Sequence, residues 1–227
     1  MFVIERQVVR RIVGGVVALL AILGSVGCST TSNGTPDPSG SGVKAPASDP
    51  AGNTTLTAAE IKAQLLTVAD LPAGWRIDNS DDGNDDSGEP SCMAGLDSVP
   101  DPSPEADVTF VHRGGFPMLM EDVGYVGSSG ARYLSLVAKA LNGCTDVSFD
   151  ADGETLRGTI SALTFPKLGD EARAWSMAFT VQGIPFDFDL LFVRKGGELL
   201  MIGYADMGMR HPSELELFAT KALAKMP

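Results

Sequence analysis

The sequence predicts an α+β fold in which helices flank an antiparallel sheet of about six or seven strands, with one disulfide. Three observations predict it: helical periodicity at three places, short alternating segments between residues 147 and 204, and an even pair of cysteines, Cys92 and Cys144, after Cys28. The composition, 44% hydrophobic and 20% charged over 227 residues, indicates one main globular domain and excludes a collagen or a wholly disordered chain.

Residues 1–27 have the pattern of a bacterial lipoprotein signal peptide. Three arginines precede an uncharged apolar run over 12–27, and this run of 16 residues is shorter than the roughly 20 needed to span a bilayer. The small residues before Cys28 resemble a lipobox, although Ser25 stands where Leu is usual. We predict cleavage before Cys28 and attachment of diacylglycerol to its thiol, which gives a lipid anchor that carries palmitate, with an uncleaved anchor or ordinary secretion as alternatives. General secretion is favoured over the twin-arginine route.

Residues 28–54 are rich in Ser, Thr, Gly, Pro, Asp and Ala and have no apolar periodicity. This composition predicts a flexible linker that starts at the lipidated Cys28. A coil of this length spans about 25 to 30 Å on average. The folded domain is therefore expected over 55–227, held near the outer face of the cell membrane.

The first half of the domain combines helical and extended patterns. Thr57 and Glu60 form a capping box that predicts a helix, and residues 75–77 look extended. Residues 108–112 and 123–126 read as strands. The apolar spacing of residues 131–141 predicts a helix that ends just before Cys144.

The second half consists mainly of strands. Alternating apolar residues predict strands at 147–149, 156–165, 174–181, 186–193 and 199–204. Asp187 and Asp189 alternate with phenylalanines, which predicts one buried and one wet face. Lys195–Gly197 predicts a hairpin turn, and Ser213 to Glu216 reads as a capping box that opens a C-terminal helix.

Cys92 and Cys144 are the two cysteines that remain after Cys28 is assigned to the anchor. In an exported chain an even pair favours a structural disulfide. A metal or redox pair is the alternative, but the sequence has no Cys-x-x-Cys and only two histidines.

The charge balance excludes some partners. Residues 1–27 hold three Arg and one Glu, so their removal changes the net charge from -12 to -14. Such an acidic domain repels nucleic acid and offers no polybasic patch to anionic lipids.

Catalytic motifs are missing, so we predict no enzyme and no cofactor. The sequence lacks Gly-x-Ser-x-Gly, His-Glu-x-x-His and a phosphate-binding Gly-rich loop followed by Lys. Asp187 and Asp189 could divide acid and base roles, but a solvated sheet face explains them more simply. His112 and His211 have no neighbouring nucleophile or ligand spacing, so we interpret them as structural.

An acidic stretch over 78–89 matches several positions of an EF-hand calcium loop. Its candidate ligands carry oxygen atoms at the required spacing: Asp78, Ser80, Asp82, Asp86 and Glu89. The context argues against the site, because the preceding residues look extended and Pro90 hinders a following helix. We therefore interpret the stretch as a solvated acidic loop, with calcium binding as the alternative.

Several short motifs in a fixed order carry a resemblance to a known family. They are Leu71–Trp75, Cys92, Cys144 after its helix, Leu168–Ala172, Val193–Gly197 and Lys221–Ala222. In this order they resemble the extracellular sensor domains of mycobacterial PknH-type serine/threonine kinases and related actinobacterial lipoproteins. The resemblance implies an antiparallel sheet with flanking helices, a cleft for an unknown ligand and no catalytic residues. This chain departs from the kinases in having no kinase domain and one cysteine pair instead of two.

Together these patterns predict a lipid-anchored, extracytoplasmic binding module. We expect it to sense or carry a small or amphipathic envelope ligand that is neutral or cationic. A lipoprotein that docks onto an envelope protein is the main alternative, and a cell-envelope hydrolase is a third.

Overall fold

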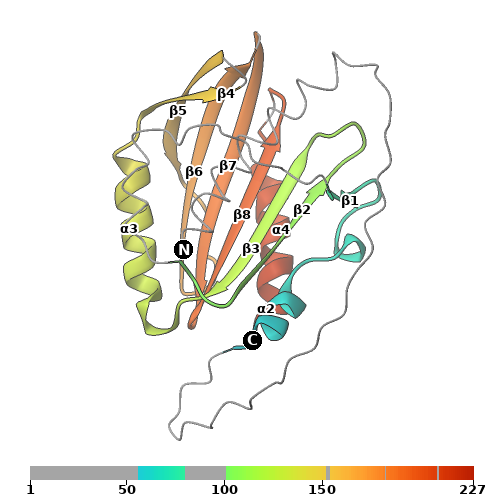
Figure 1. Ribbon diagram of the computed structural model, residues 1–227, viewed down its shortest axis with the longest axis vertical. Coiled ribbons are helices and arrows are strands. Elements are labelled where there is room, and N and C mark those ends of the chain that lie inside the picture. The colour runs from blue at the N-terminus through green and yellow to red at the C-terminus, as the bar shows by residue number, and fades with distance from the viewer. Residues whose placement is uncertain (1–55, 80–100, 152–153, 182, 209) are drawn as a thin grey trace, which may run out of the picture.

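A computed structural model describes residues 56–79, 101–151, 154–181, 183–208 and 210–227. Within these ranges eight strands form one sheet in the order β1-β2-β3-β8-β7-β6-β5-β4, and every neighbouring pair is antiparallel (Figure 1). The strands are β1 Arg76–Ile77, β2 Glu105–Val111, β3 Met118–Tyr125, β4 Asp146–Ala151, β5 Glu154–Leu163, β6 Glu171–Val181, β7 Ile184–Lys195 and β8 Glu198–Asp206. The predicted α+β class is confirmed. The sheet exceeds the expected six or seven strands because β1 pairs with β2.

Three α-helices accompany the sheet in the described part of the chain: α2 Ala58–Gln64, α3 Gly130–Asn142 and α4 Pro212–Lys225. Short 3-10 turns, η1 Val68–Asp70 and η3 Gly127–Ser129, follow α2 and precede α3. The first predicted capping box is confirmed: the Glu60 N–H donates to Thr57 Oγ1 at 3.3 Å, and the Thr57 N–H donates to Glu60 Oε2 at 2.7 Å.

The second predicted capping box is wrong. Helix α4 begins at Pro212, its N-cap is His211, and no side chain there caps the first turn. Proline lacks an N–H and has a fixed φ that suits the first helical position, so the helix starts one residue before Ser213.

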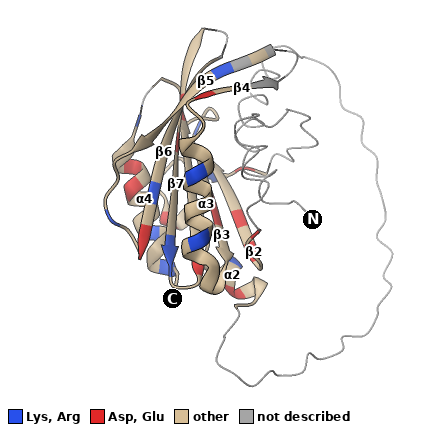
Figure 2. Cartoon of the chain, turned by 90° about the vertical axis from the view of Figure 1, so that its left-hand side faces the viewer, with Lys and Arg blue, Asp and Glu red and all other residues tan. Residues whose placement is uncertain are grey.

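Apolar residues fill both faces of the sheet, in two separate cores. Helix α3 covers one face, packing against β5, β6 and β7. Helices α2 and α4 cover the opposite face. Exposed Arg132 and Lys139 give the outer side of α3 a basic character, visible as its blue segments in Figure 2.

Strand β7 contradicts the expectation of one wet face. Phe188 and Phe192 are buried as predicted, on the α3 side, but Leu191 and Val193 on the other side are fully buried beneath α4. Asp189 shares that side and is only 2% exposed. This side of β7 is therefore not exposed to solvent as predicted, because helix α4 covers it where Leu191 and Val193 follow Asp189.

Two motifs that carried the family resemblance meet at one end of the sheet. Asp170 Oδ2 accepts the Gly196 N–H at 2.8 Å and lies 3.0 Å from Arg194 Nη1. Gly169 has a φ of 56°, and a Cβ there would lie 2.5 Å from the Arg194 carbonyl oxygen. Lys195 Nζ donates to the Met226 carbonyl at 2.8 Å, at the end of α4. These motifs hold the β7–β8 hairpin in place, so their role is structural.

Candidate functional site

The face of the sheet under α3 is rich in methionine and aromatic side chains, and we call it the methionine face. Its methionines come from three strands that are distant in sequence: Met118 and Met120 on β3, Met177 on β6 and Met201 on β8. The aromatic members are Phe116, Trp175, Phe179, Phe186, Phe188 and Phe192. All are buried.

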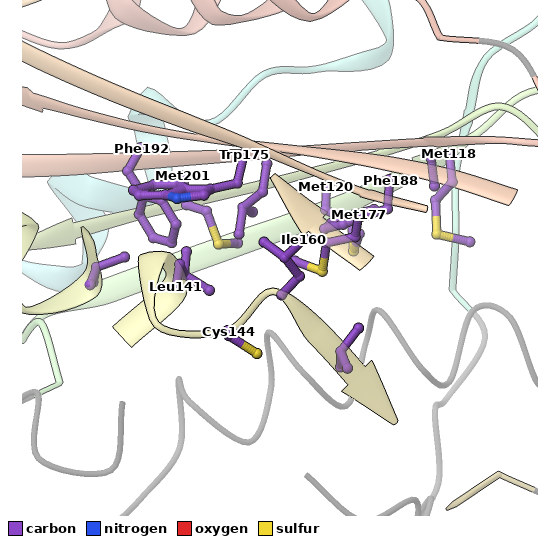
Figure 3. Packing of buried hydrophobic residues seen from close by; sticks show 14 of the residues in the cluster. Met118, Met120, Leu141, Cys144, Ile160, Trp175, Met177, Phe188, Phe192 and Met201 are labelled. Carbon is purple, nitrogen blue, oxygen red and sulfur yellow. The ribbon is translucent and has the colours of Figure 1, made fainter. Parts of the chain in front are cut away.

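The methionine face includes strands on which α3 does not mainly pack. Helix α3 packs mainly against β5, β6 and β7, whereas Met118, Met120 and Met201 belong to β3 and β8. Figure 3 shows the labelled methionines and aromatic rings in one layer along the strands, with Cys144 beyond it. Methionine is unbranched and polarisable, so it adapts to irregular apolar shapes and contacts aromatic rings favourably. The composition of this buried layer suits contact with an apolar molecule of variable shape.

A cluster of carboxylates lies on the opposite face, where β7 and β8 approach the start of α4. Asp189 is held by Arg210, whose Nη2 lies 3.2 Å from Asp189 Oδ1. Asp206 Oδ2 lies 3.0 Å from His211 Nε2. Burial raises the pKa of Asp187, the nearby Asp189 and Asp206 raise it further, and Arg210 opposes both effects. The cluster therefore attracts cations, and Arg210 supplies one from the chain itself.

Aromatic rings connect this carboxylate cluster to the core. Tyr204 stacks on Phe218 and contacts the ring of His211, and its hydroxyl donates to Glu214. Burial, together with Glu214, raises the pKa of Tyr204. Trp75 packs edge-on against Phe218 and against His112, the other histidine. Both histidines therefore have structural partners.

The other sequence-predicted site residues are only partly described. Cys28 and Cys92 lie outside the described residues, so lipidation and the disulfide remain predictions. Cys144 is 1% exposed and belongs to the core under α3. Of the calcium candidates only Asp78 is described, and its N–H donates to the Thr109 carbonyl at 2.8 Å.

Metal-binding groups and membrane-spanning helices were sought in the described residues. Among them, no three His, Cys, Asp or Glu side chains are grouped so that they could hold a metal ion. None of the helices in the same ranges is long and apolar enough to cross a membrane.

Comparison with solved structures finds one that shares this architecture and a second, weaker match. The extracellular domain of PknH from Mycobacterium tuberculosis matches with a TM-score of 0.52 and 10% sequence identity, covering 77% of this chain and 98% of that chain. An uncharacterised protein from Mycobacterium smegmatis matches with a TM-score of 0.35 and 11% identity, covering 68% and 77% of the two chains. No protein-family model and no curated protein matches the sequence. The resemblance to a PknH-type sensor domain is thus confirmed for the fold.

Sequence reasoning missed the buried carboxyl group of Glu121. It predicted a strand only at 123–126, whereas β3 starts at Met118 and includes Glu121 and Asp122. Both are buried. A signal was present, because the acidic pair lies between two apolar stretches of strand length.

Proposed function

We propose that this chain is a lipid-anchored, extracytoplasmic binding module that holds a small or amphipathic envelope molecule against the methionine face. The observation that supports this most is the continuation of that face onto β3 and β8, beside the strands against which α3 mainly packs. Adaptable methionines beside aromatic rings are typical of surfaces that accept apolar ligands of varied shape. The fold shared with a kinase's extracellular domain is compatible with a location outside the cytoplasm.

The net charge narrows the ligand class. The whole chain carries a net charge of -12, so an anionic ligand would approach against the protein's own field. This field is screened beyond about 8 Å at physiological salt but acts at shorter range. We therefore expect the polar part of the ligand to be neutral or cationic.

A thermal-shift screen against envelope lipids, glycans and peptides tests this function, with calorimetry on each hit. A ligand that binds only the folded state stabilises it by about 2.7 kcal/mol at a hundredfold excess over Kd. A variant with Met118→Leu, Met120→Leu and Met201→Leu keeps the core volume but loses flexible sulfur contacts. A loss of about 0.5 kcal/mol at each position would weaken binding about tenfold.

Met226→Leu is the matched control, because Met226 is buried in the core on the opposite face. It should leave Kd unchanged. If a ligand binds the triple variant with the same Kd as the wild type, it binds at a site other than the methionine face. The absence of any saturable shift would contradict ligand binding and favour the docking of an envelope protein.

The proposed anchor is tested separately by Cys28→Ala. Without the thiol the precursor should remain uncleaved and unacylated. It should then stay in the membrane fraction through its uncleaved apolar run, and it should be released only if another site is cleaved. Intact mass measurement of the wild type should show the added acyl chains. Processing of the Cys28→Ala variant after Gly27, together with a wild-type mass that lacks acyl chains, would rule out the lipoprotein assignment.

A further inference from the structure

Glu121 is a buried carboxyl group that links the sheet to the chain just after helix α2. It lies on β3, 1% exposed, within the face covered by α2 and α4. Its Oε2 accepts the N–H of Leu66, 55 residues away, at 2.6 Å. Its Oε1 is buried and has no hydrogen-bond partner among the described residues. The carboxyl therefore contributes one hydrogen bond across the chain and leaves one oxygen unsatisfied.

Leu66 belongs to a segment through which the chain enters the domain, residues 58–70, which we call the entry segment. It comprises α2, η1 and the residues between them. Ile61, Leu65 and Leu66 are its buried contacts with the core. Lys225 of α4 adds an ion pair to Asp70 at 3.0 Å. The hydrogen bond to Glu121 ties the backbone of the entry segment to a buried ionisable group on β3, and Gln64 of the same segment is hydrogen-bonded to the buried Glu198 of β8.

Charged and polar groups from each neighbouring element surround this contact. Burial raises the pKa of Glu121 to about 8, the Leu66 N–H and Lys225 oppose the rise, and Asp70 and Asp122 increase it. Lys225 is already paired with Asp70, so it does not neutralise an ionised Glu121 fully. The surrounding groups are Gln64 of α2, Asp70 of η1, Lys221 and Lys225 of α4, Asp122 of β3 and Glu198 of β8.

We propose that Glu121 is a proton-dependent latch for the entry segment, which docks on the sheet more tightly as the pH falls. When the segment is docked, the carboxyl is buried and keeps its proton. When it is undocked, water reaches the carboxyl, which then ionises like an ordinary glutamate. Between the pKa of Glu121 in the undocked state and its pKa in the docked state, each rise of one pH unit therefore increases the equilibrium constant for undocking about tenfold. The latch lies on the face opposite the methionine face and is independent of the proposed ligand.

Amide hydrogen exchange on the full chain tests the latch. We compare the wild type with Glu121→Gln, which keeps an oxygen that can accept from Leu66 but cannot ionise, at matched pH values from 5 to 8. For each amide we divide the exchange rate in the wild type by the rate in Glu121→Gln. This ratio removes the intrinsic pH dependence of exchange. For amides of the entry segment this ratio should rise about tenfold per pH unit between pH 5 and 7.

Two controls decide the outcome. Amides of α3 that exchange by local opening, faster than global unfolding allows, should show a ratio that does not change with pH. Glu198→Gln removes the buried carboxyl that is hydrogen-bonded to Gln64 of α2 and should retain most of the wild-type pH response. A ratio that is constant in the entry segment would overturn the proposal. So would an equal change in these α3 amides, or complete loss of the pH response in the Glu198→Gln variant.

Discussion

The free energy of unfolding of the wild type should fall as the pH rises from 5 to 8, and in the Glu121→Gln variant most of this fall should be absent. The pKa of Glu121 is about 8 in the folded protein against an ordinary value of 4.5. Between these values the folded state binds a proton that the unfolded state has released, so higher pH favours unfolding. The contribution of the Glu121 proton to the free energy of unfolding is fully present below pH 4.5. It falls by about 1.4 kcal/mol per pH unit between pH 4.5 and 8 and is constant above pH 8.

The full effect amounts to about 5 kcal/mol, a large part of a typical stability of about 5 to 15 kcal/mol. Urea unfolding at a series of pH values measures it. A smaller slope of the same sign should remain in Glu121→Gln, because burial also raises the pKa of Asp187 and of Glu198. Glu216→Gln, an exposed change on α4, should behave as the wild type. Equal slopes in the wild type and Glu121→Gln would show that Glu121 ionises normally.

Removal of both Cys92 and Cys144 should produce the second large effect. If the two cysteines are bonded, they close a loop of 53 residues. The chain-entropy account gives such a loop a stabilisation of about 4 kcal/mol. A Cys92→Ala, Cys144→Ala double variant should therefore lose about that much unfolding free energy. The buried position of Cys144 adds a smaller packing loss, because alanine leaves the volume of the sulfur empty.

Peptide mapping without reduction checks the premise of that prediction. It should return one cross-linked peptide that contains both cysteines. Two thiols that react with an alkylating reagent in the native protein would contradict the disulfide, and the stability loss would then be limited to the packing term.

The sequence predicted the fold well because its recognisable motifs are structural. Asp170, just before β6, accepts a hydrogen bond from Gly196 in the β7–β8 turn, and Lys221 donates to the Asp70 carbonyl, so residues from three of the motifs fix how elements meet. Gly74 of the Leu71–Trp75 motif has a φ of 108° and adjoins His112. Motifs with these roles indicate an architecture and carry no information about a ligand.

The candidate site was harder to predict, because its residues are brought together by tertiary packing. Met118, Met177 and Met201 are dispersed over more than 80 residues, and each one alone looks like ordinary core filling. Glu121 was missed since an acidic residue in a strand usually marks the solvent side. Asp189 was assigned to a wet face because only the folded chain shows Arg210 above it.

Native mass spectrometry of the protein, purified from the membranes of its own host, tests the central claim of ligand binding most directly. We expect a population whose mass exceeds that of the lipidated polypeptide by one small molecule that is neutral or cationic. The Met118→Leu, Met120→Leu, Met201→Leu variant should lose this added mass, while Met226→Leu should retain it. A wild-type protein that carries only its acyl chains, and that gains no mass when mixed with host lipid extract, would contradict the proposed function.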